Sequence, residues 1–121
     1  MKMHLKPLLN LLANLRVSKG YRLMSGKRYQ VFMAPSAHRK YKKFDPLLKE
    51  KIKEEIKHLS EFPCRFEELK GVLKGIRSYH FKHSETQYRI AYRILEEKTE
   101  IEVVLVKSRE SFYQTLRRIM K

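Results

Sequence analysis

Residues 76–106 read IRSYHFKHSETQYRIAYRILEEKTEIEVVLV, and this stretch decides the fold. Apolar and polar side chains alternate along most of it, which is the period of a half-buried β-strand. Two short polar segments, residues 84–86 and 96–98, interrupt the alternation and are predicted turns. The last part, residues 101–106, is almost continuously apolar, as a central strand is. Strands joined by such short loops are antiparallel, so the stretch predicts a three-stranded meander.

The segment before the meander predicts one strand and a helical hairpin. Residues 28–34 alternate as a strand, and Ser36 is the expected N-cap of a short basic helix. The Asp45-Pro46 pair is a typical helix start, with an aspartate cap and a proline in the first position. The second helix ends at Phe62-Pro63 and carries an apolar stripe at helical spacing. The stripe consists of Leu48, Ile52, Ile56 and Leu59.

The segment after the meander predicts a closing helix. Ser108 is its expected cap, and Phe112, Leu116 and Ile119 lie on its inner face. The element order is then β-α-α-β-β-β-α. We therefore predict an α+β fold with a small antiparallel four-stranded sheet, an N-terminal helical hairpin and a C-terminal helix. The helices are expected to pack on one face of the sheet and to leave the other face partly open.

Charge limits the class of partner. The chain has 121 residues, which fits one domain, and its 28 lysines and arginines against 13 acidic residues give a net charge of +15. A positive field of this size attracts polyanions. RNA, DNA, the ribosome and acidic proteins are therefore the candidate partners.

Cysteine and histidine usage points away from disulfides and metals. Cys64 is the only cysteine, so no intramolecular disulfide can form, which is typical of the reducing cytoplasm where we expect the protein. His80 and His83 would point to opposite faces of a strand, and no metal and no cofactor are expected. No apolar run approaches the roughly 20 residues that a membrane helix needs, so we expect no membrane partner.

Residues 1–24 are predicted to be a basic leader in front of a domain over residues 25–121. The leader has five basic residues, no acidic residue, and leucines at helical spacing. A signal peptide fits poorly, because asparagines interrupt the apolar stretch and no small-x-small cleavage pattern follows. An amphipathic basic arm that touches RNA, membrane or partner remains an alternative. The plainest interpretation is that the leader is disordered or not translated, with Met24 as the start.

Strand alternation places four basic side chains on the open face of the sheet. His80 and Lys82 share a face of one strand, and Arg89 and Arg93 share a face of the next. Metal-free RNA cleavage needs such a group, because the site must take a proton from the 2′-OH and stabilise charge on the phosphate. Arginine grips phosphate bidentately, and a lysine or histidine with a lowered pKa can serve as base.

Further candidates follow the last strand. Lys107 ends that strand, and Arg109 and Tyr113 come next, in the expected first turn of the closing helix. Being four residues apart, these two side chains would share a helix face. The predicted site therefore combines cations from three strands with one tyrosine.

Three motifs, in this order and spacing, resemble the RelE-type toxins of the RelE/ParE superfamily. They are LKG at residues 69–71, YRIAY at residues 88–92 and KSRESFY at residues 107–113. The resemblance covers about residues 28–121. It implies a toxin of a type II toxin–antitoxin system that cleaves mRNA in the ribosomal A site as a metal-free endoribonuclease. It also implies contact with ribosomal RNA and an antitoxin encoded in the same operon.

The resemblance also implies roles for single residues. Arg89 would clamp the scissile phosphate, and Lys82 would act as base or stabilise the transition state. His80 stands where close relatives have a second lysine, and it could itself be the base. Either Arg109 or Lys107 would protonate or neutralise the leaving oxygen.

The remaining assignments concern the substrate and the ribosome. Tyr113 would orient the 2′-OH or stack on a base, and Lys70 and Lys107 would help to dock ribosomal RNA. Arg39, Lys40 and Lys43 on the short basic helix form a solvated face or a second docking surface.

Two other functions remain open. ParE-type members of the superfamily share the fold but poison DNA gyrase and lack a nuclease site. A non-catalytic RNA- or ribosome-binding module is the second alternative. The joint presence of Lys82, Arg89, Arg109 and Tyr113 favours the nuclease.

Overall fold

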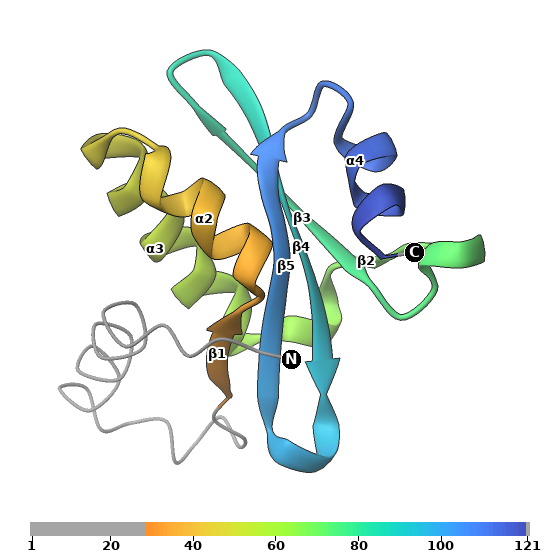
Figure 1. Cartoon of the computed structure of the whole chain (residues 1–121). Helices are drawn as coiled ribbons and strands as arrows, with labels where there is room; N and C mark the ends of the chain where they lie inside the picture. The colour runs from red at the N-terminus through yellow and green to blue at the C-terminus, as the bar shows by residue number, and fades with distance from the viewer. Residues whose placement is uncertain (1–28, 121) are drawn as a thin grey trace, which may run out of the picture.

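The computed structural model describes residues 29–120, in which a twisted sheet lies between a helical hairpin and a single helix (Figure 1). The predicted leader lies outside the described residues. The helices and strands follow one another in the order that the sequence predicts, with one short strand added. The predicted α+β class is therefore confirmed.

The sheet has five strands in the spatial order β1-β5-β4-β3-β2. Their bounds are β1 Gln30–Met33, β2 Glu67–Glu68, β3 Arg77–His83, β4 Thr86–Leu95 and β5 Glu100–Ser108. The antiparallel meander of β3, β4 and β5 is as predicted. Short 3₁₀ turns, at Pro63–Arg65, Gly71–Leu73 and Glu96–Lys98, connect the elements.

Two details of the sheet differ from the predicted four antiparallel strands. The added strand β2 is only two residues long and pairs with β3 at the edge. At the other edge, β1 pairs with β5 in parallel. The helical hairpin carries the chain from one edge of the sheet to the other. The last strand of the meander therefore returns beside β1 and runs in the same direction.

The helical hairpin consists of α2 (Pro35–Lys43) and α3 (Pro46–Glu61). The expected cap at Ser36 is wrong: α2 begins at Pro35 after Ala34, because proline fits the first helical position. The cap at Asp45 is confirmed, since Asp45 Oδ1 accepts a hydrogen bond of 2.8 Å from the backbone N–H of Leu48.

The hairpin covers one face of the sheet. The predicted stripe of α3 is buried there, against alternate residues of the strands. Those strand residues include Val31, Tyr79, Ile90, Tyr92 and Val103. This cluster is the larger of the two apolar clusters. It fixes which strand residues face the hairpin, so the alternate residues face the other side of the sheet.

The closing helix α4 (Phe112–Ile119) packs on the opposite face, contrary to the expectation that all helices share one face (Figure 1). Phe112 and Leu116 are buried there against Ala91 and Leu105 of the sheet. Ser108 does not cap the helix, because β5 runs through Ser108 and a turn follows it. The N-cap is Ser111, which adopts a left-handed backbone with φ of 57°. The face predicted to be open is thus half covered.

Among residues 29–120, no helix is long and apolar enough to span a bilayer.

Candidate active site

Three basic side chains form a row across the three central strands of the sheet, β3, β4 and β5, on the face that carries α4. The register pairs His80 of β3 with Arg89 of β4, and Arg89 with Lys107 of β5. Paired residues of antiparallel strands project to the same side, and their Cβ atoms lie about 4.5–5.5 Å apart. We call His80, Arg89 and Lys107 the basic row.

Arg89, at the centre of the row, lies beside the start of α4. Its guanidinium carbon is 5.0 Å from the ring centroid of Tyr113 and 6.0 Å from that of Phe112. Both distances fall within the range of cation–π attraction. The two rings pack edge to face on each other at 5.3 Å, so the arginine rests on a fixed aromatic support. Arg89 as a whole is only partly exposed.

His80 contacts a buried serine on its own strand. Its Nε2 lies 3.1 Å from the Oγ of Ser78, two residues earlier on the same face of β3. Partial burial lowers the pKa of His80, and the positive charge of Arg89 lowers it further, while Glu67 opposes the shift. The lowered pKa favours the neutral imidazole, which is the form that can accept a proton.

Lys107, at the other end of the row, is tied to the turn that leads into α4. Its ammonium group donates a hydrogen bond to the backbone carbonyl of Glu110. In the same turn, the backbone N–H of Arg109 donates to the carbonyl of Gln87 at 2.9 Å, which extends the pairing between β4 and β5. The turn therefore places the ammonium group of Lys107 close to the start of α4.

Two further predicted residues lie at the margin of the row. Lys82 shares the face but is two residue pairs further along, opposite Gln87, and its exposed ammonium group lies 3.8 Å from Glu85. Arg109 is exposed and lies in the turn, not in the helix. The argument that Arg109 and Tyr113 share a helix face is therefore wrong.

Arg93 lies on the same face of β4 as Arg89, as expected, but it forms an ion pair away from the basic row. Its Nε lies 2.7 Å from Oε1 of Glu102, whose side chain is buried. A buried carboxylate requires such a partner, so Arg93 has a structural role.

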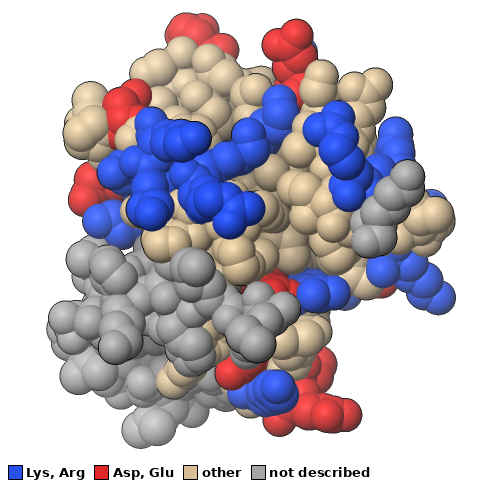
Figure 2. Space-filling model, in the orientation of Figure 1, with Lys and Arg blue, Asp and Glu red and all other residues tan. Residues whose placement is uncertain are grey.

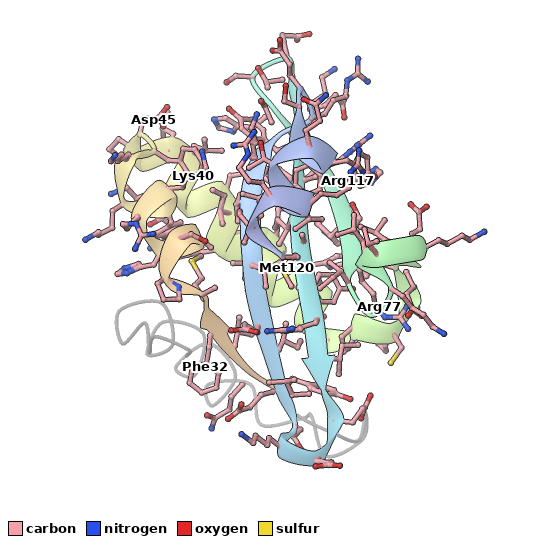
Figure 3. The ribbon with its side chains drawn as sticks, turned by 45° about the vertical axis from the view of Figure 1, so that its right-hand side comes forward. Phe32, Lys40, Asp45, Arg77, Arg117 and Met120 are labelled. Carbon is pink, nitrogen blue, oxygen red and sulfur yellow. The ribbon has the colours of Figure 1, made fainter. Side chains whose placement is uncertain are left out.

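The residues predicted to dock RNA are exposed, but they lie on two sides of the sheet. Arg39, Lys40 and Lys43 are on α2, on the hairpin side. Lys70 lies between Leu69 and Leu73, whose side chains belong to the apolar cluster under α4. Figure 2 shows lysines and arginines gathered over α2 and continuing toward α4. In Figure 3, the labelled Lys40 on α2 and Arg117 on α4 stand on either side of β5.

Two residues of the site were not predicted from the sequence. They are Ser78, which contacts His80, and Phe112, whose ring supports Arg89. Strand alternation already placed Ser78 on the face of His80, and a small polar residue among buried positions could have drawn attention to it. The contact of Phe112 with Arg89 depends on the side of the sheet where α4 packs. Over residues 29–120, no group of three or more histidine, cysteine or acidic side chains could hold a metal ion.

Comparison with known proteins places this chain in a family. Residues 31–117 match the family described as the ParE-like toxin of type II bacterial toxin–antitoxin systems. No curated protein matches the chain.

Several solved structures match the fold. A chain of the RelBE2 toxin–antitoxin complex from Mycobacterium tuberculosis is 30% identical with a TM-score of 0.60, over 68% of this chain and 99% of that one. A mutant of the E. coli toxin RelE in the free state is 21% identical with a TM-score of 0.59, over 78% and 99%. The E. coli RelBE toxin–antitoxin complex is 21% identical with a TM-score of 0.55, over 64% and 93%.

Proposed function

Because this chain belongs to the ParE-like toxins of type II bacterial toxin–antitoxin systems, we propose that it is a RelE-type toxin that cleaves mRNA on the ribosome without a metal. The basic row carries this proposal. It joins a cation that can grip phosphate, a neutral imidazole and an ammonium group on one face. A surface that only bound another protein would not need a proton acceptor directly opposite an arginine.

The reaction that fits the row is attack of a ribose 2′-OH on the adjacent phosphate. The imidazole of His80 takes the 2′-OH proton as the new O–P bond forms. Arg89 grips two phosphate oxygens and stabilises the charge that develops on them. Lys107 donates a proton to the departing 5′-oxygen as its bond to phosphorus breaks. The products are a 2′,3′-cyclic phosphate and a 5′-hydroxyl.

The other predicted site residues have supporting roles. Tyr113 supports Arg89 in the free protein, and a base of the substrate can stack on its ring. Lys82 adds positive potential at the margin and is the alternative base. Arg109 is the alternative to Lys107 at the leaving oxygen. Lys70 and the three basic residues of α2 bind ribosomal RNA phosphates.

The partner that controls the toxin is an antitoxin from the same operon. The similar solved structures include RelBE toxin–antitoxin complexes, which supports a partner of the RelB type. A single apolar cluster attaches α4 to the sheet beside the row. An antitoxin helix or strand can therefore neutralise the site by covering the row or by displacing α4.

A gyrase poison of the ParE type is the second candidate, because the family description that matches names ParE. The two candidates differ in what the purified full-length chain does. A nuclease cuts ribosome-bound mRNA and leaves 5′-hydroxyl ends, whereas a gyrase poison traps gyrase on DNA and leaves mRNA intact. A non-catalytic ribosome-binding module would do neither.

The decisive variant is Arg89→Ala. Loss of one charge-assisted contact to the phosphate is expected to cost about 2–4 kcal/mol, which is roughly a 30- to 1000-fold loss in cleavage rate. The matched control is Arg65→Ala, which removes an exposed arginine that lies over Phe62, on a 3₁₀ turn away from the row. Mapping of mRNA ends on ribosomes measures both. Equal cleavage by the Arg89 and Arg65 variants would contradict the proposal.

A further inference from the structure

Ser78 is a buried polar residue whose hydroxyl contacts the ring of His80. Its relative exposure is 3%, and it is one of three buried polar or charged residues among residues 29–120. A buried hydroxyl costs free energy unless it is hydrogen-bonded. The imidazole of His80 is the partner that satisfies Ser78. Glu102 pairs with Arg93, and Ser60 donates to the carbonyl of Lys57 within α3, so both of the others have structural partners.

The position of Ser78 on β3 is set by two neighbouring strands. It lies opposite Glu67 of β2 and opposite Ala91 of β4. Neither the alanine nor the strand backbone can turn the imidazole of His80, whereas the serine hydroxyl touches one of its two nitrogens. A hydroxyl can donate to a ring nitrogen or accept from it, so the contact fixes which nitrogen faces Ser78, and the direction of the hydrogen bond sets the tautomer.

We propose that Ser78 is a positioning residue for His80: its hydroxyl accepts a hydrogen bond from Nε2–H and leaves the Nδ1 lone pair free to take the 2′-OH proton. This inference rests on the proposed nuclease function. It adds a residue outside the basic row to the site and assigns a tautomer to the imidazole.

The charged groups around His80 are compatible with this role. Arg89 faces it from β4, with Lys107 beyond on β5, and Lys82 follows it on β3. Glu67, on β2, is the acidic group that opposes the lowering of the His80 pKa. Burial and the charge of Arg89 lower the His80 pKa and so favour the neutral ring, which has two possible tautomers. Without the serine, the neutral ring can rotate or exchange tautomers.

The test compares Ser78→Ala with Ser60→Ala in the full-length chain. Both substitutions remove a buried serine hydroxyl, but Ser60 is bonded within α3, on the hairpin side of the sheet. The ¹⁵N chemical shifts of the His80 ring report its tautomer without any need for activity. Wild type and Ser60→Ala should show the Nε2–H form, and Ser78→Ala should show a mixture.

Cleavage on ribosomes is the second readout. Loss of one hydrogen bond to the base should lower kcat about 3- to 10-fold in Ser78→Ala, with KM unchanged. Ser78→Thr keeps the hydroxyl on a strand-compatible side chain and should restore both the ring shifts and kcat.

Two results would overturn the inference. One is a wild-type ring in the Nδ1–H form, and the other is a Ser78→Ala protein with unchanged ring shifts or unchanged kcat. Failure of the proposed function looks different, because the wild-type chain itself would then leave mRNA uncut.

Discussion

Strand parity and register together set the surroundings of Arg89. Strand parity turns it away from the larger apolar cluster, and the register places it between a histidine and a lysine. Like charges on neighbouring strands repel, so the row destabilises the sheet unless something compensates. The ring of Tyr113 and the neutral state of His80 both reduce that repulsion. A row of this kind is more easily understood as a phosphate site than as a device for stability.

The depressed pKa of His80 gives a pH prediction at this scale. As a base, His80 must be neutral, so kcat/KM should be constant at neutral pH and fall as the pH drops through the His80 pKa. Because that pKa is lowered by burial and by Arg89, the inflection should lie below the ordinary histidine value of 6.5. Profiles of kcat/KM against pH report the free enzyme and give this value directly.

The control for the pH prediction is a second histidine. The pKa of His38 on α2 is also lowered, by burial and by Lys42, but His38 lies on the hairpin side. His80→Gln should abolish the acid limb together with most of the activity, whereas His38→Gln should keep both. An acid limb that survives in His80→Gln would assign the base to another group.

For the helices and strands, the sequence predicted the features that have a regular hydrophobic period. Alternation determined the meander and the faces of His80, Lys82 and Arg89, and helical spacing determined the stripe of α3. The side of α4 could not be predicted, because only three strand residues form its apolar support, Ala91, Val104 and Leu105. A bulge between Ala91 and Tyr92 also shifts the register along β5, and no pattern in the sequence marks it.

The turn after β5 explains why the sequence could not decide between Lys107 and Arg109. Residues 107–113 contain both Lys107 and Arg109, and only the last paired residue of the strand decides which of them faces Arg89. Strand pairing continues through Ser108, so Lys107 falls in the row and Arg109 falls in the turn. Sequence periodicity places the ends of elements poorly, because turns have no period.

The start of α3 supports a stability prediction. Asp45→Ala removes the bond to the N–H of Leu48 and should lower the free energy of unfolding by about 1 kcal/mol. Asp45→Asn keeps an oxygen acceptor and should lose much less. Urea denaturation measures both, and cleavage should be unchanged because α3 lies on the far side of the sheet. An equal loss in the two variants would contradict the capping explanation.

At the scale of the whole molecule, the net charge of +15 adds a long-range field to the local site. Basic residues on α2, near Lys70 and along the row place positive charge on both sides of the sheet. Such a field speeds the encounter with a polyanion and weakens as salt is added. Affinity for the ribosome should therefore depend on the whole surface, while the rate of cleavage depends on the row.

The leader should add to this field without contributing to the fold or to the basic row. A chain that comprises residues 24–121 should fold and cleave mRNA as the full chain does, because the row and both apolar clusters are built from residues 29–120. The leader carries five basic residues, so its removal should slow binding to the ribosome at low salt. At about 150 mM salt, where the Debye length is about 8 Å, this difference should shrink. Circular dichroism, thermal unfolding and end mapping on ribosomes measure fold and activity. A truncated chain that is insoluble, or that is folded but unable to cut mRNA, would show that the leader belongs to the working protein.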